Sequence, residues 1–159
     1  MTARIMDDFD RKILKVLQTD SGLSNAELAA RIGLSPSPCL RRVKALERAG
    51  VIAGYAAKVN REAVGLSVSA FVEVQLERQT HGATEAFLAA VDKLPQVVAC
   101  YLMTGSLDFL LQVVAPDLAA YGDFITHRML KLPGVKDVRS SFVLKEVKQP
   151  GGLPLDHIG

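Results

Sequence analysis

The sequence predicts an α+β protein with two domains, an N-terminal winged helix-turn-helix domain and a C-terminal ferredoxin-like βαββαβ domain. Apolar residues recur at helical spacing before Gly50 and alternate at strand spacing after Asn60. The pattern Leu-Pro-x-Val occurs at residues 94–97 and again at 132–135, which indicates an internal duplication in the second part. A chain of 159 residues is long enough for two small domains.

Two helices are predicted at the start of the chain. The first covers about residues 8–19, where Asp7 or Asp8 can accept hydrogen bonds from the unpaired N–H groups of its first turn. Ser24 and Glu27 form a capping box, in which each side chain accepts a hydrogen bond from the backbone N–H of the other residue. This box predicts the start of a second, short helix.

A tight turn at Gly33 separates the second helix from a third. Ser35 is predicted to cap the third helix, which runs to Gly50, a residue suited to a left-handed C-terminal conformation. A short capped helix, a glycine turn and a further capped helix make a helix-turn-helix arrangement. Residues 51–52 and 55–59 are then expected to form a short strand pair, as a small wing or a bridge.

After Asn60 the pattern predicts elements in the order β-α-β-β-α-β, which is that of a split βαβ unit. The strands are expected over residues 68–76, 97–103, 107–114 and 135–147, and the helices over 84–93 and 116–130. A lone four-stranded sheet of this type leaves one face without helices. Apolar residues on both faces of the first strand therefore predict a homo-oligomer.

The charge is unevenly divided between the two parts. Residues 1–61 carry eleven Lys or Arg and six Asp or Glu, a net +5, and because the whole chain is +2 the remainder carries −3. A basic first third favours a polyanionic partner for that part, although such a surface can also be simply solvated. The predicted divisions are a winged helix-turn-helix domain at 1–61, a βαββαβ oligomerisation domain at 62–150, and a flexible tail at 151–159.

Several classes of protein are disfavoured. No apolar stretch is long enough to span a membrane and the N-terminus is not typical of a signal peptide, so we expect a soluble, cytoplasmic protein. Cys39 and Cys100 lie far apart without metal-ligand spacing, so we expect no disulfide, metal or cofactor. An enzyme would have to use His127 near Asp123, or Asp108. Such an isolated His–Asp pair is more typical of a surface than of a catalytic site, and we expect no enzymatic activity.

The third helix has one face that suits DNA. Its core arc is predicted to contain Cys39, Leu40, Val43 and Leu46. The opposite arc is polar and basic, with Arg42 on its flank, and contains Ser37, Pro38, Arg41, Lys44, Ala45 and Arg48. Arginine can bind guanine bidentately in the major groove, and Lys or Ser can bind phosphates. A solvated charged face is the alternative, but the preceding capped helix and glycine turn favour DNA binding.

The turn between the second and third strands is a second candidate site. Asp108 beside open backbone N–H groups could bind the ammonium of an amino acid while those N–H groups bind its carboxylate. The alternative is a plain hairpin turn in which Asp108 bonds to local backbone. The residues alone favour this alternative.

The sequence resembles a known family. Residues 25–44, with the run Gly-Leu-Ser-Pro-Ser-Pro-Cys-Leu at 33–40, look like the DNA-binding segment of the Lrp/AsnC, or feast/famine, regulators. Further matching segments extend the resemblance from about Met6 to Gln149: residues 46–52, 54–55, 132–135 and 146–149. The resemblance implies a winged helix-turn-helix joined to a βαββαβ, RAM or ACT-like, ligand-sensing domain. It also implies dimers and, often, octamers.

The resemblance also implies which residues act. DNA contacts are expected from the helix-turn-helix, at Asn25, Ser35, Ser37, Pro38, Arg41, Arg42, Lys44 and Arg48. The effector is expected at the turn, at an interface between dimers, with a hydroxyl residue of the last strand facing the same pocket: Thr104, Gly105, Ser106, Asp108 and Ser140. The family often has an acidic residue where this chain has Ser106, so the identity of the amino acid is not implied.

These expectations combine into one function, a transcriptional regulator that binds a pseudo-palindromic operator in double-stranded DNA and responds to an amino acid or a related small effector. An architectural DNA binder without a ligand response shares the same basic face and oligomeric state. The sequence leaves that alternative open.

Overall fold

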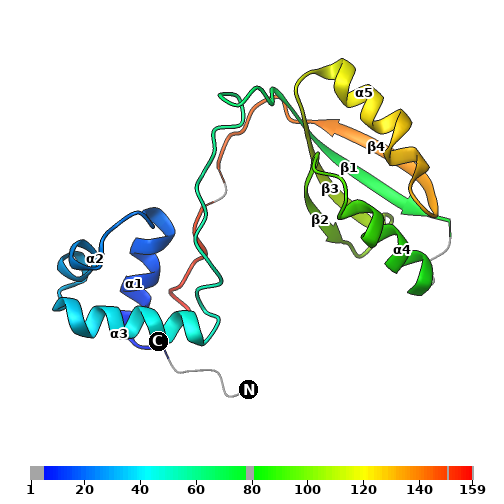
Figure 1. The fold of residues 1–159 in the computed structure, drawn as a ribbon. Helices are drawn as coiled ribbons and strands as arrows, with labels where there is room; N and C mark the ends of the chain where they lie inside the picture. Colours follow the sequence, from blue (N-terminus) through cyan, green and yellow to red (C-terminus); the bar gives the residue numbers. More distant parts are fainter. Residues whose placement is uncertain (1–5, 78–80, 150, 159) are drawn as a thin grey trace. The chain divides into compact units, whose positions relative to one another are not determined.

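The computed structural model describes residues 6–77, 81–149 and 151–158. The chain divides into two compact units (Figure 1), the first formed by Met1–Lys58 together with Val147–Gly159 and the second by Val59–Glu146. Among the described residues, no helix is long and apolar enough to cross a membrane.

The first unit contains three helices: α1 at Asp8–Thr19, α2 at Asn25–Ile32 and α3 at Pro36–Arg48. Asp7 caps α1, because its carboxylate accepts a hydrogen bond from the Asp10 backbone N–H at 3.0 Å. The capping box is confirmed, with Ser24 and Glu27 each accepting from the other's backbone N–H. Gly33 adopts φ 74°, the left-handed conformation that ends α2 and that glycine adopts most readily.

The predicted strand pair after α3 is not formed, and the backbone from Ala49 to Ser67 contains no strand. The N–H groups of Val51 and Ile52 instead donate to the Leu46 carbonyl at 3.0 and 3.3 Å. Residues 51–52 therefore close the C-terminus of α3, and their donors are not available for a strand ladder.

The C-terminal segment belongs to the first unit, which corrects the prediction of a flexible tail. Leu155 is 8% exposed and lies in the same apolar cluster as Ile13 and Leu28. Ile158 packs against the edge of that cluster. Local patterning gave no sign of this contact, because the apolar surface that these residues cover lies far away in the sequence.

The second unit is a four-stranded antiparallel sheet in the order β2-β3-β1-β4, with helices on one face (Figure 1). Its elements are β1 Val68–Leu76, α4 His81–Val91, β2 Val97–Leu102, β3 Phe109–Ala115, α5 Leu118–His127, the 3₁₀ helix η1 Met129–Lys131 and β4 Val135–Phe142. This is the predicted split βαβ order. The last strand ends at Phe142, before the predicted residue 147. Beyond the pair Ala70 and Phe142, the Val143 N–H still donates to the Ser69 carbonyl of β1 at 2.9 Å.

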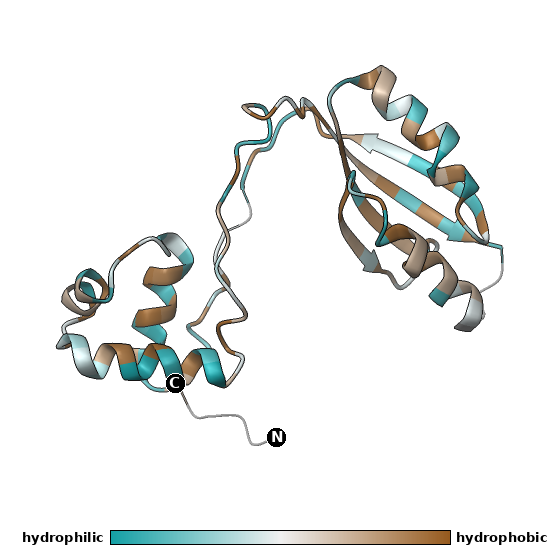
Figure 2. Cartoon of the chain, in the orientation of Figure 1, coloured by the Kyte–Doolittle hydropathy of each residue, from teal (hydrophilic) through white to brown (hydrophobic). Residues whose placement is uncertain are grey.

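The two faces of the sheet differ in burial. Alternate residues of β1, including Val72 and Val74, are buried beneath the helices, and the Phe87 and Phe109 rings pack with their centroids 4.6 Å apart. Figure 2 shows hydrophilic residues between hydrophobic ones along β1. Phe71, on the opposite face, is exposed. We call that opposite side the open face of the sheet.

Candidate nucleic-acid interface and effector pocket

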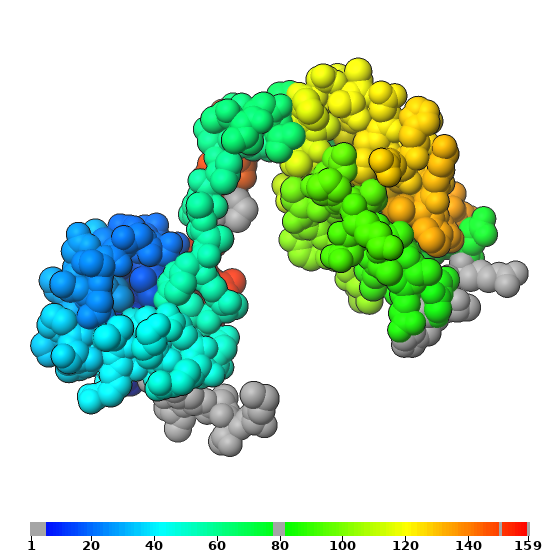
Figure 3. Space-filling view, in the orientation of Figure 1, coloured from blue at the N-terminus to red at the C-terminus, as the bar shows by residue number. Residues whose placement is uncertain are grey.

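One face of α3 is exposed and carries short polar and basic side chains. Its members are four, three and four residues apart, so they lie above one another on the helix, and all are exposed: Ser37, Arg41, Lys44 and Arg48. We call them the basic stripe. The other side of α3 is buried through Cys39, Val43 and Leu46. Figure 3 shows α3 in cyan at the surface of the first unit.

Two cations of the basic stripe have no partner within the described ranges of the chain. Among the residues that the structure describes, neither Arg41 nor Arg48 has an ion-pair or hydrogen-bond partner. Lys44 donates a hydrogen bond to Glu47 at 2.9 Å and is itself more than half exposed. An unpaired guanidinium can bind a guanine edge or a phosphate without first breaking an internal contact.

Arg42 has a different environment from the basic stripe. Its Nη1 lies 2.8 Å from Asp7 Oδ2 and 3.0 Å from Asp10 Oδ1, and the guanidinium lies 5.4 Å from the centre of the Phe9 ring. Asp10 is 1% exposed and Arg42 is 28% exposed as a side chain. The sequence grouped Arg42 with the DNA contacts, but the structure places it where it ties α1 to α3.

The same contacts shift the pKa values of Asp7 and Arg42. The pKa of Asp7 is lowered, first by the hydrogen bond from the Asp10 backbone N–H and then by Arg42. The hydrogen bond to Asp7 is the largest cause of a raised pKa for Arg42. Both shifts favour the charged forms, so Arg42 holds α3 against α1 as an ion pair.

The beginning of α3 differs from the prediction. Ser35 occupies the N-cap position with an extended backbone, but its side chain makes no capping hydrogen bond. Pro36 and Pro38 have no N–H, so two of the usual donors at a helix N-terminus are missing. Asn25 donates from Nδ2 to the Pro36 carbonyl at 2.8 Å and so fastens α2 to the start of α3. The N-terminus of α3 is therefore a weaker phosphate site than expected.

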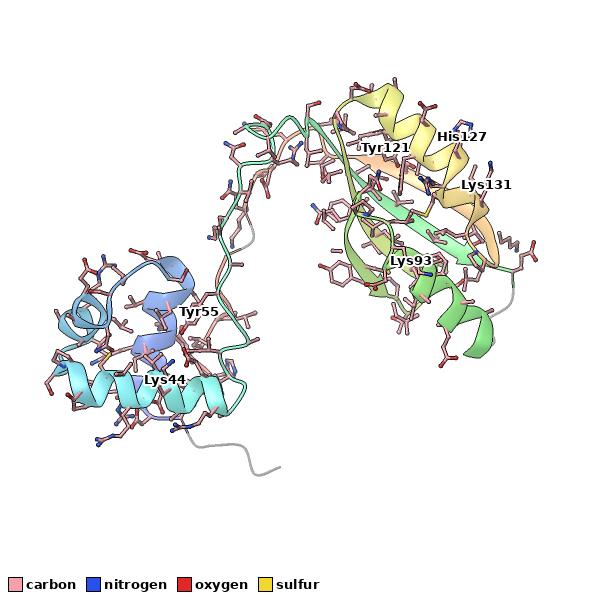
Figure 4. All side chains as sticks on the ribbon, in the orientation of Figure 1. Lys44, Tyr55, Lys93, Tyr121, His127 and Lys131 are labelled. Carbon is pink, nitrogen blue, oxygen red and sulfur yellow. The ribbon has the colours of Figure 1, made fainter. Side chains whose placement is uncertain are left out.

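A contact that the sequence did not reveal joins α3 to the segment that follows it. The Tyr55 hydroxyl donates to Glu47 at 3.0 Å, and Glu47 also accepts from Lys44 (Figure 4). The Lys44 hydrogen bond is the largest cause of the lowered pKa of Glu47. Burial is the largest cause of the raised pKa of Tyr55. The carboxylate thus links the basic stripe to the chain that leaves the helix-turn-helix.

Leu40 is 46% exposed, although the helical wheel placed it in the core. It borders a cavity of about 190 Å³ that is also lined by Leu23, Lys44 and Tyr55. Its place at the edge of the buried arc explains the difference, because no residue of α1 or α2 covers that edge completely.

The turn before β3 is fastened to the central strand. The Asp108 carboxylate accepts from the Leu76 N–H at 2.7 Å, and the Asp108 N–H donates to the Val74 carbonyl at 3.0 Å. Gly105 has φ 112°, which an L side chain rarely adopts. The Asp108 carboxylate therefore bonds to the backbone of the central strand β1, and not to that of its own turn as the hairpin alternative predicted.

A small pocket on the open face of the sheet lies beside this turn. It has a volume of about 150 Å³ and is lined by Glu73, Gln75, Ser106, Leu107, Asp137 and Arg139. Glu73 of β1 and Arg139 of β4 are opposite each other in the strand register. Arg139 Nε lies 3.3 Å from Asp137 Oδ2. Of these residues the sequence singled out only Ser106. Strand alternation could have located the others once the register was known. Thr104 and Gly105 are exposed beside it.

Ser140 does not belong to this pocket within one chain. It is paired with Val72, which is buried beneath the helices, and its Oγ accepts from the Tyr121 hydroxyl at 2.6 Å. The Tyr121 ring packs edge-on against Phe142 with centroids 4.9 Å apart. Within one chain, strand alternation thus directs Ser140 to the helix-covered side and away from the pocket on the open face, and a role for it between dimers stays a prediction.

The His127 and Asp123 pair lies on α5, and both side chains are exposed (Figure 4). His127 Nδ1 lies 3.1 Å from the Asp123 carbonyl oxygen and 3.8 Å from its carboxylate. Within the described part of the chain, no three His, Cys, Asp or Glu residues gather as metal ligands. Cys39 and Cys100 are free thiols.

Comparisons with known proteins cover nearly the whole chain. A family model for a winged helix-turn-helix DNA-binding domain matches residues 6–53, and one for an Lrp/AsnC ligand binding domain matches residues 69–153. The leucine-responsive regulatory protein of Salmonella typhimurium is 45% identical over 148 residues, which are 93% of this chain and 90% of that protein. The protein of the same name from Escherichia coli K12 matches with the same identity and coverage.

Solved structures give the same picture. A transcriptional regulator from Neisseria meningitidis, in complex with L-methionine, is 47% identical with a TM-score of 0.92, over 96% of this chain and 98% of that one. An AsnC family transcriptional regulator from Agrobacterium tumefaciens is 39% identical with a TM-score of 0.90, over 96% and 99% of the two chains. The likeness extends over both units of the present chain.

Proposed function

This chain belongs to the Lrp/AsnC family of transcriptional regulators, and on that premise we propose how its two units divide the work. The first unit binds operator DNA through the basic stripe of α3. The second unit binds an amino acid beside the turn at residues 104–108, and this binding alters the assembly or the DNA affinity of the protein. The relatives are regulators, and we propose no catalytic activity for this chain.

The observation that carries the DNA-binding proposal is the exposure of the basic stripe on a helix whose other side is buried. The major groove admits an α-helix, and side chains one turn apart on its outer face can reach neighbouring base pairs and phosphates. In the first unit, Arg41 lies near the middle of the stripe and is unpaired among the described residues. We therefore assign it base contact, with Ser37, Lys44 and Arg48 at the phosphates.

Selection of duplexes from a random-sequence library by the full-length protein tests this proposal. We expect enrichment of a two-fold symmetric sequence with half-sites about one helical turn apart, because a symmetric dimer presents two equivalent recognition helices. The enriched duplex should bind less tightly as salt increases, since phosphate contacts release counterions. Failure to enrich any sequence would contradict sequence-specific binding and favour an architectural role.

The effector proposal rests on the charges of the pocket on the open face. Glu73 and Asp137 supply negative charge and Arg139 supplies positive charge within a volume of about 150 Å³. An amino acid carries both an ammonium and a carboxylate, so a pocket with both signs suits it. The relative from Neisseria meningitidis was solved with L-methionine, which supports an amino acid as the class of effector.

A thermal-shift screen against the twenty amino acids tests the effector. A ligand that binds only the folded protein stabilises it by mass action, by roughly 2.7 kcal/mol at one hundred times its Kd. We expect one or a few amino acids to raise Tm, and the Arg139→Ala variant to lose that increase. The Ser140→Ala variant is the matched control, because Ser140 lies on the other face of the sheet and should retain the increase. Equal loss in both variants would contradict the pocket.

The open face of the sheet supports the proposed dimer. Phe71 and Tyr101 are exposed there, and an apolar sheet face in a small protein is usually covered by a partner. Grouping of dimers into an octamer is the assembly that the family resemblance implies. A DNA partner makes the cytoplasm the proposed place of action.

A further inference from the structure

The C-terminal segment runs along one face of α1. Arg11, Lys15 and Gln18 are four and three residues apart, so they share that face, and each of them holds the segment. Arg11 donates to the Ile158 carbonyl at 2.8 Å, and Lys15 donates to the Asp156 carboxylate at 2.6 Å.

The side-chain amide of Gln18 binds the backbone of the segment. Its amide donates to the Leu153 carbonyl at 3.3 Å and accepts from the Leu153 N–H at 2.5 Å. Gln18 therefore pairs with the extended chain in the way a neighbouring strand would. An ideal Cβ at Gly152 would lie 2.9 Å from Gln18 Cδ, so the segment passes directly against the Gln18 side chain.

An apolar anchor accompanies these polar contacts. Leu155 is buried with Ile13 and Leu14 of α1, while Leu153 remains exposed. The segment also borders a cavity of about 540 Å³, which it shares with α1 and residues 51–58. One buried leucine and a few polar bonds beside a cavity make an attachment that can open more readily than a closely packed core contact.

The attachment changes how the two units are connected. The chain enters the second unit at Val59 and leaves it at Glu146, after β4. Asp137 and Arg139 of the proposed effector pocket lie on β4, and residues 143–152 connect this strand in sequence to the docked segment. Docking on α1 therefore gives the first unit a second connection to the second unit. The first connection is the chain that follows Lys58.

We propose that residues 153–158 are an intramolecular latch, which docks on α1 through Gln18, Lys15, Arg11 and the buried Leu155. The latch restrains the DNA-binding unit and links it to β4, the strand that carries two residues of the proposed effector pocket. This inference rests on the proposed function for its consequence, although not for the docking itself. Since Arg42 ties α1 to α3, the restraint reaches the recognition helix. Intramolecular docking is favoured over docking on a second copy, because the segment and α1 belong to one chain and covalent connection raises their effective concentration for each other.

A cysteine pair tests the docking. An ideal Cβ at Gly152 lies 3.0 Å from Gln18 Cβ, and disulfides need about 3.5–4.5 Å, so Gln18→Cys with Gly152→Cys requires only a small adjustment. We expect the full-length double variant to form an intrachain disulfide under mild oxidation, seen as a faster-migrating monomer on a non-reducing gel. The two single-cysteine variants are the controls. A cross-linked dimer in place of that monomer, or no cross-link, would overturn the intramolecular latch.

DNA binding tests the restraint. The probes are the duplex selected by the wild-type protein and a duplex with only one of its half-sites. We expect Leu155→Ser to weaken binding to the complete duplex by about 3- to 10-fold, because a released unit loses more orientational freedom on binding, and to leave half-site binding unchanged. The oxidised cysteine pair should bind the complete duplex at least as tightly as the wild-type protein does.

Two results on these probes separate the possibilities. Equal weakening on both probes would mean that Leu155→Ser only damages the fold of the first unit, and would overturn the restraint. Reduction of the cysteine pair should return its affinity to that of the two single-cysteine variants. If the wild-type protein selects no duplex, the proposed function fails, whereas the cross-link still decides whether the segment docks.

Discussion

Replacing Arg41 with alanine is expected to weaken binding to the selected operator by about 1–3 kcal/mol, which is roughly 5- to 150-fold. Among the described residues Arg41 has no internal partner, so the loss comes from the DNA contact and not from the folded protein. The thermal stability of the Arg41→Ala variant should therefore match that of the wild-type protein. If Arg41 contacts a base, discrimination against a duplex with one substituted base pair should also fall at that position.

Gel shifts over a range of salt concentrations measure both effects. Arg128→Ala is the matched control, because it removes the same charge from an exposed site in the second unit. A variant that loses affinity equally for the selected and the substituted duplex would reduce Arg41 to a phosphate contact, with a salt slope lower by about one. Unchanged affinity for both duplexes would contradict its assignment to the interface.

Replacing the neighbouring Arg42 with alanine should instead lower the stability of the folded first unit. Arg42→Ala removes the cation beside Asp10, which is 1% exposed, and leaves a buried carboxylate without that charge partner. Removing one member of a buried ion pair costs about 3–5 kcal/mol. Because Arg42 is itself partly exposed, we expect a loss near the lower limit, about 3 kcal/mol, in the stability of the first unit.

Hydrogen exchange of peptides from α1 and α3 reports this loss locally, since opening of the first unit exposes their amides. Arg42→Lys should recover part of the protection, because an ammonium can still pair with one of the two carboxylates. If Arg42→Ala keeps its protection and instead loses operator affinity as Arg41→Ala does, then Arg42 is a DNA contact, as the sequence analysis first grouped it.

These two arginines show what a sequence can reveal about a helix face. The helical wheel placed Arg41 on the exposed arc and Arg42 on its flank, and this much follows from a repeat of 3.6 residues. The wheel gave no information about Asp10, which reaches Arg42 from another helix. The basic stripe was thus predictable, whereas the division between binding and positioning depended on a tertiary contact.

The second unit shows the same limit. The order of strands and helices followed from alternation, the recurring Leu-Pro-x-Val and the glycine turns. The pocket did not, because Glu73 and Arg139 meet only through the register of β1 and β4. Ser140 was assigned from the family resemblance, and its strand position directs it to Tyr121 instead. Leu155 was missed because its partners are on α1, at the far end of the sequence.

The attachment of the turn to β1 has a consequence for the thermodynamics of sensing. Asp108 bonds that turn to Leu76 and Val74 of the central strand before any ligand arrives. A turn that is already ordered loses little conformational entropy when a ligand binds. The selectivity of the site therefore depends on the shape and charge of the ligand more than on ordering of the protein around it. The strands then keep their register when a ligand binds. The bound ligand instead changes the surface that the open face of the sheet offers to a neighbouring subunit.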